Sequence, residues 1–273
     1  YARSVENYLL DNYTMRLGCC IKSDNISIIR LLGYDFCELP GTEIMSYTNE
    51  EWKKKKLMIC KAGLEVLGLN AFCDGKYPFV GPNVSEKKLD TYIHKIVQRG
   101  KDIGIRNLGI GAPAARILPP AYSKEKADAQ MISFLRNVSH EALKHNINVL
   151  IESLNPYICN YCNRISEAKE LVSRVNEPNL FILWDQYHSV LAGETEDEVL
   201  SEMSYVRHIH ISSWDFSDST RHFIKRKDQN HLITLRDFLN KAGYNNTVSI
   251  EADLNEVDKE AADSIRLLRA YLK

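Results

Sequence analysis

The sequence has no long apolar run, no excess of charge of one sign and no low-complexity segment. No stretch approaches the ~20 consecutive apolar residues that a membrane helix needs. No secretory leader is recognisable, so we expect a cytoplasmic location. The formal net charge is −1, which provides no general attraction for a polyanion such as DNA. These absences predict a protein that binds neither membranes nor nucleic acid.

A disulfide framework is also not expected, because the chain is long and its seven cysteines are an odd number. Cys159 and Cys162 have the C-x-x-C spacing of redox and zinc sites. However, the sequence has no second C-x-x-C pair to complete a four-thiolate zinc site. We therefore interpret Cys159 and Cys162 as ordinary reduced thiols.

Short apolar runs alternate with longer amphipathic stretches along all 273 residues, and no linker separates them. The runs predicted as strands are Met15–Cys20, Tyr34–Leu39, Leu67–Phe72, Arg106–Gly111, Asn148–Glu152, Leu180–Asp185, Val206–Ser212 and Thr247–Glu251. The clearest predicted helices are Glu50–Leu67, Ser85–Gly104, Lys124–His145 and Glu256–Lys273. Glycines that we expect to cap helices in the left-handed conformation precede several strands: Gly33, Gly68, Gly104 and Gly243.

Eight strands in strict alternation with helices predict an α/β fold, a single-domain (β/α)₈ TIM barrel over residues 1–273. The alternative is an open doubly wound sheet, which usually has a glycine-rich phosphate-binding turn after its first strand. Here the first strand continues into Cys19–Lys22, which has no such turn. The sequence therefore favours the barrel.

Polar residues that could carry chemistry lie on the last four predicted strands. Glu152, Asp185 and Glu251 each end a strand, and His210 lies near the end of the strand before the last. Barrel active sites form at these carboxyl ends, and a carboxylate after an apolar run is costly unless it is paired or metal-bound. The four residues therefore predict a site for one divalent metal ion. Mostly oxygen ligands with one nitrogen favour Mn²⁺, suit Mg²⁺ or Co²⁺, and admit Zn²⁺.

Other polar residues surround this predicted site. His188 follows Asp185 by three residues, so we expect it to contact the substrate or a metal ligand. His208 lies deeper on its strand and is interpreted as a residue that fills the barrel. Glu38 is either a further site carboxylate or part of a buried ion pair. The long polar loop Ser213–His231 is predicted to cover the site and to set specificity.

On these motifs the sequence resembles the xylose isomerase-like barrel superfamily, and within it the ketose 3-epimerases of the tagatose and psicose type. WDQYH resembles their D-x-x-H motif, HIHIS their H-x-H motif, and SIEAD their final strand. The segment Ile151–Asn163 is similar to their I-E-P-L-N-x-Y-E-x-N-x-x-N pattern. The matching positions are Glu152, Leu154, Asn155, Tyr157, Asn160 and Asn163.

The resemblance implies a sugar substrate, with His188 and Asn155 among its contacts. It also implies that the metal binds a ketose carbonyl and stabilises the enediolate that forms on proton loss. Glu152 and Glu251 would act as an acid/base pair from opposite faces of the substrate. Many relatives are dimers or tetramers, and a homo-oligomer is compatible with the resemblance.

Two positions depart from the epimerase pattern. Ile158 stands where the epimerases have a substrate-binding Glu, and Phe216 stands where they have a substrate-binding Arg. Arg221, from the long loop, is our candidate to replace that arginine. Because these departures affect substrate contacts and not the metal ligands, we expect the metal chemistry to be shared with the epimerases. The sequence does not predict that the substrate is the same.

The sequence thus predicts a metal-dependent sugar isomerase or epimerase and does not separate these two outcomes. A related lyase, of the C-glycoside deglycosidase or inosose dehydratase type, is the alternative, because its chemistry also begins with proton removal next to a carbonyl. The apurinic-site endonucleases use three metals and extra histidines at the ends of the second and third strands. The predicted second and third strands of this sequence, YDFCEL and LGLNAF, contain no histidine, which disfavours an endonuclease. A non-enzymatic sugar-binding barrel would not need two opposed glutamates.

Overall fold

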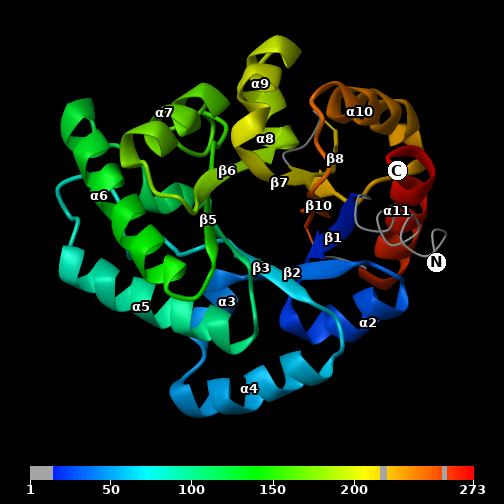
Figure 1. The fold of residues 1–273 in the computed structure, drawn as a ribbon, viewed down its shortest axis with the longest axis horizontal. Helices are drawn as coiled ribbons and strands as arrows, with labels where there is room; N and C mark the ends of the chain where they lie inside the picture. Colours follow the sequence, from blue (N-terminus) through cyan, green and yellow to red (C-terminus); the bar gives the residue numbers. More distant parts are fainter. Residues whose placement is uncertain (1–14, 216–219, 254–256) are drawn as a thin grey trace, which may run out of the picture.

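The computed structural model describes residues 15–215, 220–253 and 257–273. Eight parallel strands close into a barrel in the order β1–β10–β7–β6–β5–β4–β3–β2 (Figure 1). The strands are β1 (Arg16–Cys20), β2 (Phe36–Pro40), β3 (Val66–Asn70), β4 (Asn107–Ile110), β5 (Asn148–Glu152), β6 (Leu180–Asp185), β7 (Val206–Ile211) and β10 (Thr247–Ile250). This confirms the (β/α)₈ barrel predicted from the alternation of strands and helices.

Helices cover the outside of the barrel (Figure 1). The α-helices are α2 (Ile26–Leu31), α3 (Gly41–Ser46), α4 (Asn49–Lys61), α5 (Glu86–Asp102), α6 (Lys124–Leu143), α7 (Ile165–Val175), α8 (Gln186–Leu191), α9 (Glu196–Glu202), α10 (Gln229–Lys241) and α11 (Val257–Tyr271). Short 3₁₀ turns are η1 (Ser23–Asn25), η2 (Pro113–Ala115), η3 (Met203–Tyr205) and η4 (Arg226–Asp228). No helix in the described ranges is long and apolar enough to cross a membrane.

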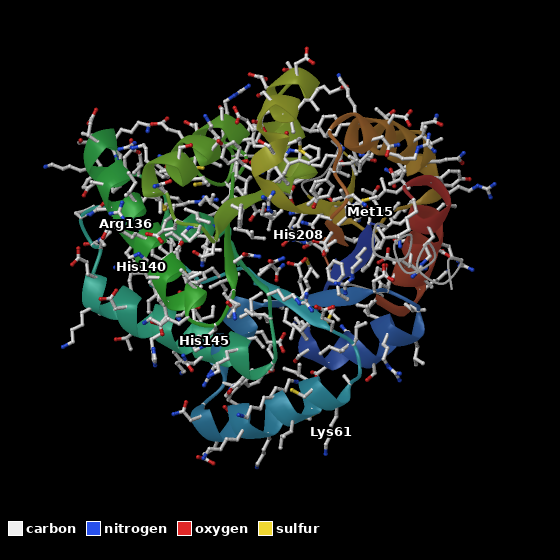
Figure 2. All side chains as sticks on the ribbon, viewed as in Figure 1. Met15, Lys61, Arg136, His140, His145 and His208 are labelled. Atoms are coloured by element: carbon white, nitrogen blue, oxygen red, sulfur yellow. The ribbon has the colours of Figure 1, made fainter. Side chains whose placement is uncertain are left out.

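The barrel strands are buried on both faces, because helices pack outside them and side chains fill the interior. Every residue of β3 is buried. Inside the barrel, Gly18 of β1 leaves room for the ring of Phe36, which a Cβ at this position would meet. His208 also lies within the ring of strands and is fully buried (Figure 2).

One expected helix cap and one helix boundary were wrong. Gly33, Gly104 and Gly243 have the predicted positive φ, but Gly68 lies inside β3. Gly63, with φ +76°, follows the end of α4 instead. The helix predicted to run to Leu67 therefore stops at Lys61, because the apolar residues after Gly63 pair with the barrel sheet rather than continue the helical face.

The loop after β7 forms a small hairpin at the carboxyl end of the barrel. Its strands, β8 (Ser213–Trp214) and β9 (Arg221–His222), pair in antiparallel fashion, with Trp214 opposite Arg221. This pairing returns the chain toward the strand ends and places Arg221 there. Phe216, the position that departs from the epimerase pattern, lies outside the described residues.

Candidate active site

The four residues predicted to bind a metal meet at the carboxyl end of the barrel. Glu152, Asp185, His210 and Glu251 each offer one ligand atom, and these atoms all lie within 4.8 Å of one another. Their strands β5, β6, β7 and β10 are consecutive in the barrel, so side chains from the same end converge. Glu152, Asp185 and His210 are buried, and Glu251 is partly exposed.

The orientation of His210 fits a cation among these carboxylates. Its Nδ1 lies 3.2 Å from Glu251 Oε2 and 3.9 Å from Asp185 Oδ2, yet this buried nitrogen has no hydrogen-bond partner in the described structure. Its Nε2 lies 3.2 Å from Glu38 Oε1, so Nε2–H can donate there. Nδ1 is then the nitrogen that a cation held among the carboxylate oxygens would engage. Three oxygens and one nitrogen in this arrangement fit Mn²⁺, Mg²⁺ or a similar divalent ion.

The three carboxylates of the cluster are in unequal electrostatic environments. Burial, together with the charges of Glu251 and Asp185, raises the pKa of Glu152 to about 8. Burial also opposes the charge on Glu251, but the positive charges of Arg221 and His210 outweigh it and hold the pKa of Glu251 well below its usual range. Crowding of carboxylates at one buried point is relieved by a bound cation.

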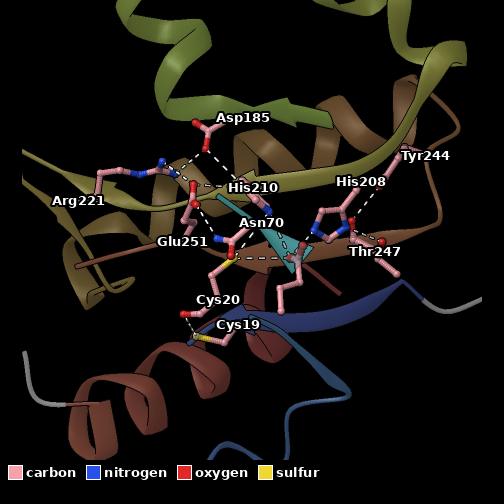
Figure 3. Close-up of polar contacts among 11 residues, drawn as sticks. Cys19, Cys20, Asn70, Asp185, His208, His210, Arg221, Tyr244, Thr247 and Glu251 are labelled. Carbon is pink, nitrogen blue, oxygen red and sulfur yellow. Dashed lines mark hydrogen bonds and ion pairs between the residues drawn. The ribbon is translucent and has the colours of Figure 1, made fainter. Parts of the chain in front are cut away.

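Arg221 reaches this cluster from β9 (Figure 3). Its Nη2 lies 2.5 Å from Asp185 Oδ2, and its Nη1 lies 2.7 Å from Glu251 Oε2. These are the two oxygens that face His210 Nδ1. The guanidinium carbon lies 5.2 Å from the centre of the Tyr187 ring, which supports its flat face. The structure therefore brings Arg221 into the site, where its contact with substrate stays a prediction.

His188 and Asn155 form a second pair beside Glu152. Asn155 Nδ2 donates to His188 Nδ1 at 2.8 Å, and His188 Nε2 lies 3.8 Å from Glu152 Oε1. Asp185 holds the backbone of His188, because its Oδ1 accepts a hydrogen bond from His188 N at 2.9 Å. Burial lowers the pKa of His188, which favours the neutral ring. With Nδ1 accepting, the remaining proton is on Nε2 and points toward Glu152.

Glu38 forms a buried network with His208 and His210, two side chains that are labelled in Figure 3. It is 2% exposed, and its Oε1 lies 2.7 Å from His208 Nε2 and 3.2 Å from His210 Nε2. His208 Nδ1 lies 2.7 Å from the hydroxyl oxygen of Thr247. Burial raises the pKa of Glu38, but the two histidines outweigh burial and leave that pKa well below its usual range. The structure shows the buried pairing of Glu38, and its role as a further site carboxylate stays a prediction.

The sequence matches the family model of the xylose isomerase-like TIM barrel over residues 26–271. The chain belongs to this family. No curated protein matches it in a sequence search.

Several solved structures are similar to this chain. The D-psicose 3-epimerase of Clostridium cellulolyticum H10, solved with D-tagatose, gives a TM-score of 0.78 at 16% identity, covering 95% of this chain and 100% of that chain. The D-allulose 3-epimerase of a Methylomonas species, in complex with D-allulose, gives a TM-score of 0.77 at 17% identity, covering 95% of this chain and 98% of that chain. A 3-keto-D-glucoside 4-epimerase from E. coli gives a TM-score of 0.72 at 19% identity, covering 94% of this chain and 100% of that chain. At these identities the similarity establishes a shared fold.

Two residues of this xylose isomerase-like site were not among the predicted site residues. Asn70 ends β3, and its Nδ2 donates to Glu251 Oε1 at 2.9 Å. Arg116 is fully buried, and its Nη2 donates to the backbone oxygen of Glu152 at 2.6 Å. Nearby, Gly111 leaves space for the carboxylate of Glu152, which a Cβ at that position would meet. Asn70 had no sequence signal because it lies inside an apolar run, with Ala71 and Phe72 after it.

Proposed function

We propose that this xylose isomerase-like barrel is a divalent-metal-dependent sugar epimerase or isomerase. One observation supports this proposal above others: Glu152, Asp185, His210 and Glu251 offer ligand atoms within 4.8 Å of one another at the carboxyl end of the barrel. Two of these residues are glutamates: Glu152 ends β5 and Glu251 directly follows β10, and because these strands are not adjacent the two side chains approach the site from different sides. Similar barrels include the psicose, allulose and 3-keto-glucoside epimerases.

The same four side chains would hold the ion, with His210 bound through Nδ1. A bound divalent ion supplies Lewis acidity that polarises a sugar carbonyl. Asp185 has a second task, because its Oδ1 accepts a hydrogen bond from the backbone of His188. This contact fixes the start of α8 and so holds the ring of His188 near Glu152.

Glu152 and Glu251 are the proposed proton carriers. One glutamate, as the carboxylate, removes a proton from the carbon next to the carbonyl, and the other, which starts as the protonated acid, returns a proton and is left as the carboxylate. Return to the opposite face of the same carbon gives epimerisation, and return to the neighbouring carbon gives isomerisation. Arg221 contributes a fixed positive charge next to Glu251, which favours the negative charge that develops on the substrate oxygens. His188 Nε2–H and Asn155 bind substrate oxygens on the side of Glu152.

The test is deuterium exchange into D-fructose, D-tagatose and D-psicose in deuterium oxide, after measurement of the metal content of the purified protein. We expect one divalent ion per chain and deuterium at a carbon next to the carbonyl. Glu152→Gln and Glu251→Gln should each slow exchange by about 10²-fold or more, as loss of a general acid or base does. Glu196→Gln, on the outer helix α9, is the matched control and should exchange at the wild-type rate. A protein without metal, or exchange that survives both site substitutions, would contradict the proposal.

A related lyase is the second candidate function. Ile158, which replaces the substrate-binding Glu of the epimerases, is 43% exposed in the loop after β5 and offers no side-chain hydrogen bond. This position favours a substrate that differs from a free ketose. If deuterium enters a keto-glycoside or inosose and a carbon–oxygen or glycosidic carbon–carbon bond is then cleaved, the lyase replaces the epimerase.

A further inference from the structure

Asn70 lies beside the metal cluster and has one side-chain atom without a partner. Its Nδ2 donates to Glu251 Oε1 at 2.9 Å (Figure 3). Because a carboxylate oxygen accepts this bond, the amide orientation is fixed, with Nδ2 toward Glu251 and Oδ1 directed away from that contact. Asn70 is 7% exposed, and its Oδ1 is buried with no hydrogen-bond partner among the described residues.

The backbone around Asn70 holds this unpartnered oxygen in place. Asn70 pairs with Pro40 of β2 as the last residue of β3. The next residue, Ala71, has φ 45°, a left-handed conformation that an alanine rarely adopts, and its carbonyl oxygen accepts from Thr42 N at 3.1 Å. A buried acceptor without a donor is unfavourable, so one that is held rigidly in a site indicates a donor that arrives with the ligand.

We propose that Asn70 Oδ1 accepts a hydrogen bond from a substrate hydroxyl next to the carbon at which Glu251 transfers a proton, while Nδ2 positions Glu251. This inference rests on the proposed function. A hydroxyl fits because it can donate to the amide oxygen. A carboxylate or phosphate would place further acceptors against both Asn70 Oδ1 and Glu251. The β3 side of the site therefore selects a neutral, hydroxylated part of the sugar.

The test compares the binding of D-fructose, 1-deoxy-D-fructose and 4-deoxy-D-fructose to the Mn²⁺-loaded protein. Binding is measured through the relaxation of the sugar protons near Mn²⁺, which needs no turnover. Asn70→Ala should bind D-fructose about 3- to 10-fold more weakly, as the loss of one hydrogen bond does. The same substitution should leave the binding of one of the two deoxy sugars unchanged. The dissociation constant of Mn²⁺ should stay within about twofold of wild type, because the amide is not a metal ligand in this proposal.

Asn107→Ala is the matched control. Asn107 is also 7% exposed, but it begins β4 at the other end of the barrel, where it accepts from Asn148 Nδ2 at 3.3 Å. It should bind all three sugars like wild type. Asn70→Ser, which also shortens the side chain, repeats the measurement if Asn70→Ala folds poorly.

Four results would overturn the inference, and the last of them would overturn the proposed function as well. An equal loss of affinity for D-fructose and both deoxy sugars would mean that Asn70 only positions Glu251. A tenfold loss of Mn²⁺ affinity would make the amide oxygen a metal ligand. Wild-type affinity in Asn70→Ala, in a protein that exchanges deuterium into D-fructose, would overturn this inference and leave the proposed function intact. A wild-type protein that neither binds nor exchanges any of the ketoses would overturn both.

Discussion

The two ring nitrogens of His210 face different groups, and the contact of Nε2 with Glu38 leaves Nδ1 as the nitrogen that can bind a metal ion. Glu38 accepts from Nε2, so Nδ1 is the nitrogen that faces Glu251 and Asp185 and is placed to bind a metal ion. The hydroxyl of Thr247 has the corresponding effect on His208, whose Nδ1 accepts from it while Nε2 donates to Glu38. Both histidines therefore donate through Nε2 to Glu38 Oε1, which favours one tautomer of each ring.

Glu38→Gln should therefore weaken metal binding. A glutamine carries no negative charge to attract the two N–H groups that Oε1 accepts, and its N–H₂ group can favour the wrong tautomer of His210. We expect the dissociation constant for Mn²⁺ to rise about 10- to 100-fold, as loss of such a supporting carboxylate does. Isothermal titration calorimetry measures it, and Glu65→Gln, at the other end of the barrel, is the control. Unchanged Mn²⁺ affinity in Glu38→Gln would show that another contact sets the tautomer.

Among the site residues, the sequence predicted those whose place in the barrel is set by the strand that leads to them. Glu152, Asp185 and Glu251 could be found because each ends an apolar run. The contacts of Arg221 could not be predicted, since they depend on the antiparallel register of β8 and β9 within a polar loop. Asn70 could not be predicted either, because its partner Glu251 directly follows β10, near the far end of the sequence.

Among the elements, α6 is tied to α7 and to the loop after β5 through one buried aspartate. Asp128 Oδ1 accepts from the hydroxyl of Tyr161 at 2.7 Å, and Oδ2 accepts from Arg174 Nη1 at 3.1 Å. Lys124 Nζ lies 3.0 Å from both oxygens. Burial raises the pKa of Asp128, but the hydrogen bonds from Tyr161, Lys124 and Arg174 outweigh burial, and the net pKa is lowered.

Asp128→Asn should destabilise the protein in a pH-dependent way. Because the folded-state pKa is lowered, the charged carboxylate contributes stability above the unfolded-state pKa of about 4. That contribution is lost as the pH falls through the lower folded-state value. We expect a loss of about 1–3 kcal/mol at pH 7, which shrinks below about pH 4. Urea unfolding at both pH values measures it, with the exposed Asp237→Asn as control. An equal loss at pH 7 and pH 3 would contradict this role of the charge.

For the molecule as a whole, the candidate metal ligands extend over four consecutive strands of the barrel. An ion that binds only the folded protein stabilises it by mass action, about 2.7 kcal/mol at a free concentration of 100 times the dissociation constant. For a chain of this size we expect Mn²⁺ to raise the Tm by roughly 5 °C or more, and EDTA to reverse the shift. Calorimetry measures this, and Asp185→Asn should lose most of the shift. An equal shift in Asp185→Asn would place the ion elsewhere.

The barrel could be predicted from the alternation of elements, because each βα unit shows its own pattern of apolar residues. The end of α4 was not predictable from the same pattern. The residues after Gly63 are apolar enough for either helix or strand, and their pairing with β2 decides between the two. Pairing across the sheet is a property of the assembled molecule, which local periodicity does not contain.

The pairing of β1 with β10 joins the beginning of the described barrel to a strand near its end. A ribosome that makes this chain releases β1 early, with one edge open until residues 247–250 follow more than two hundred positions later. Glu251, the last of the four clustered side chains, emerges with them. Nascent chains that stop short of this point can neither close the ring nor assemble the cluster, so both are completed in the same late step of synthesis.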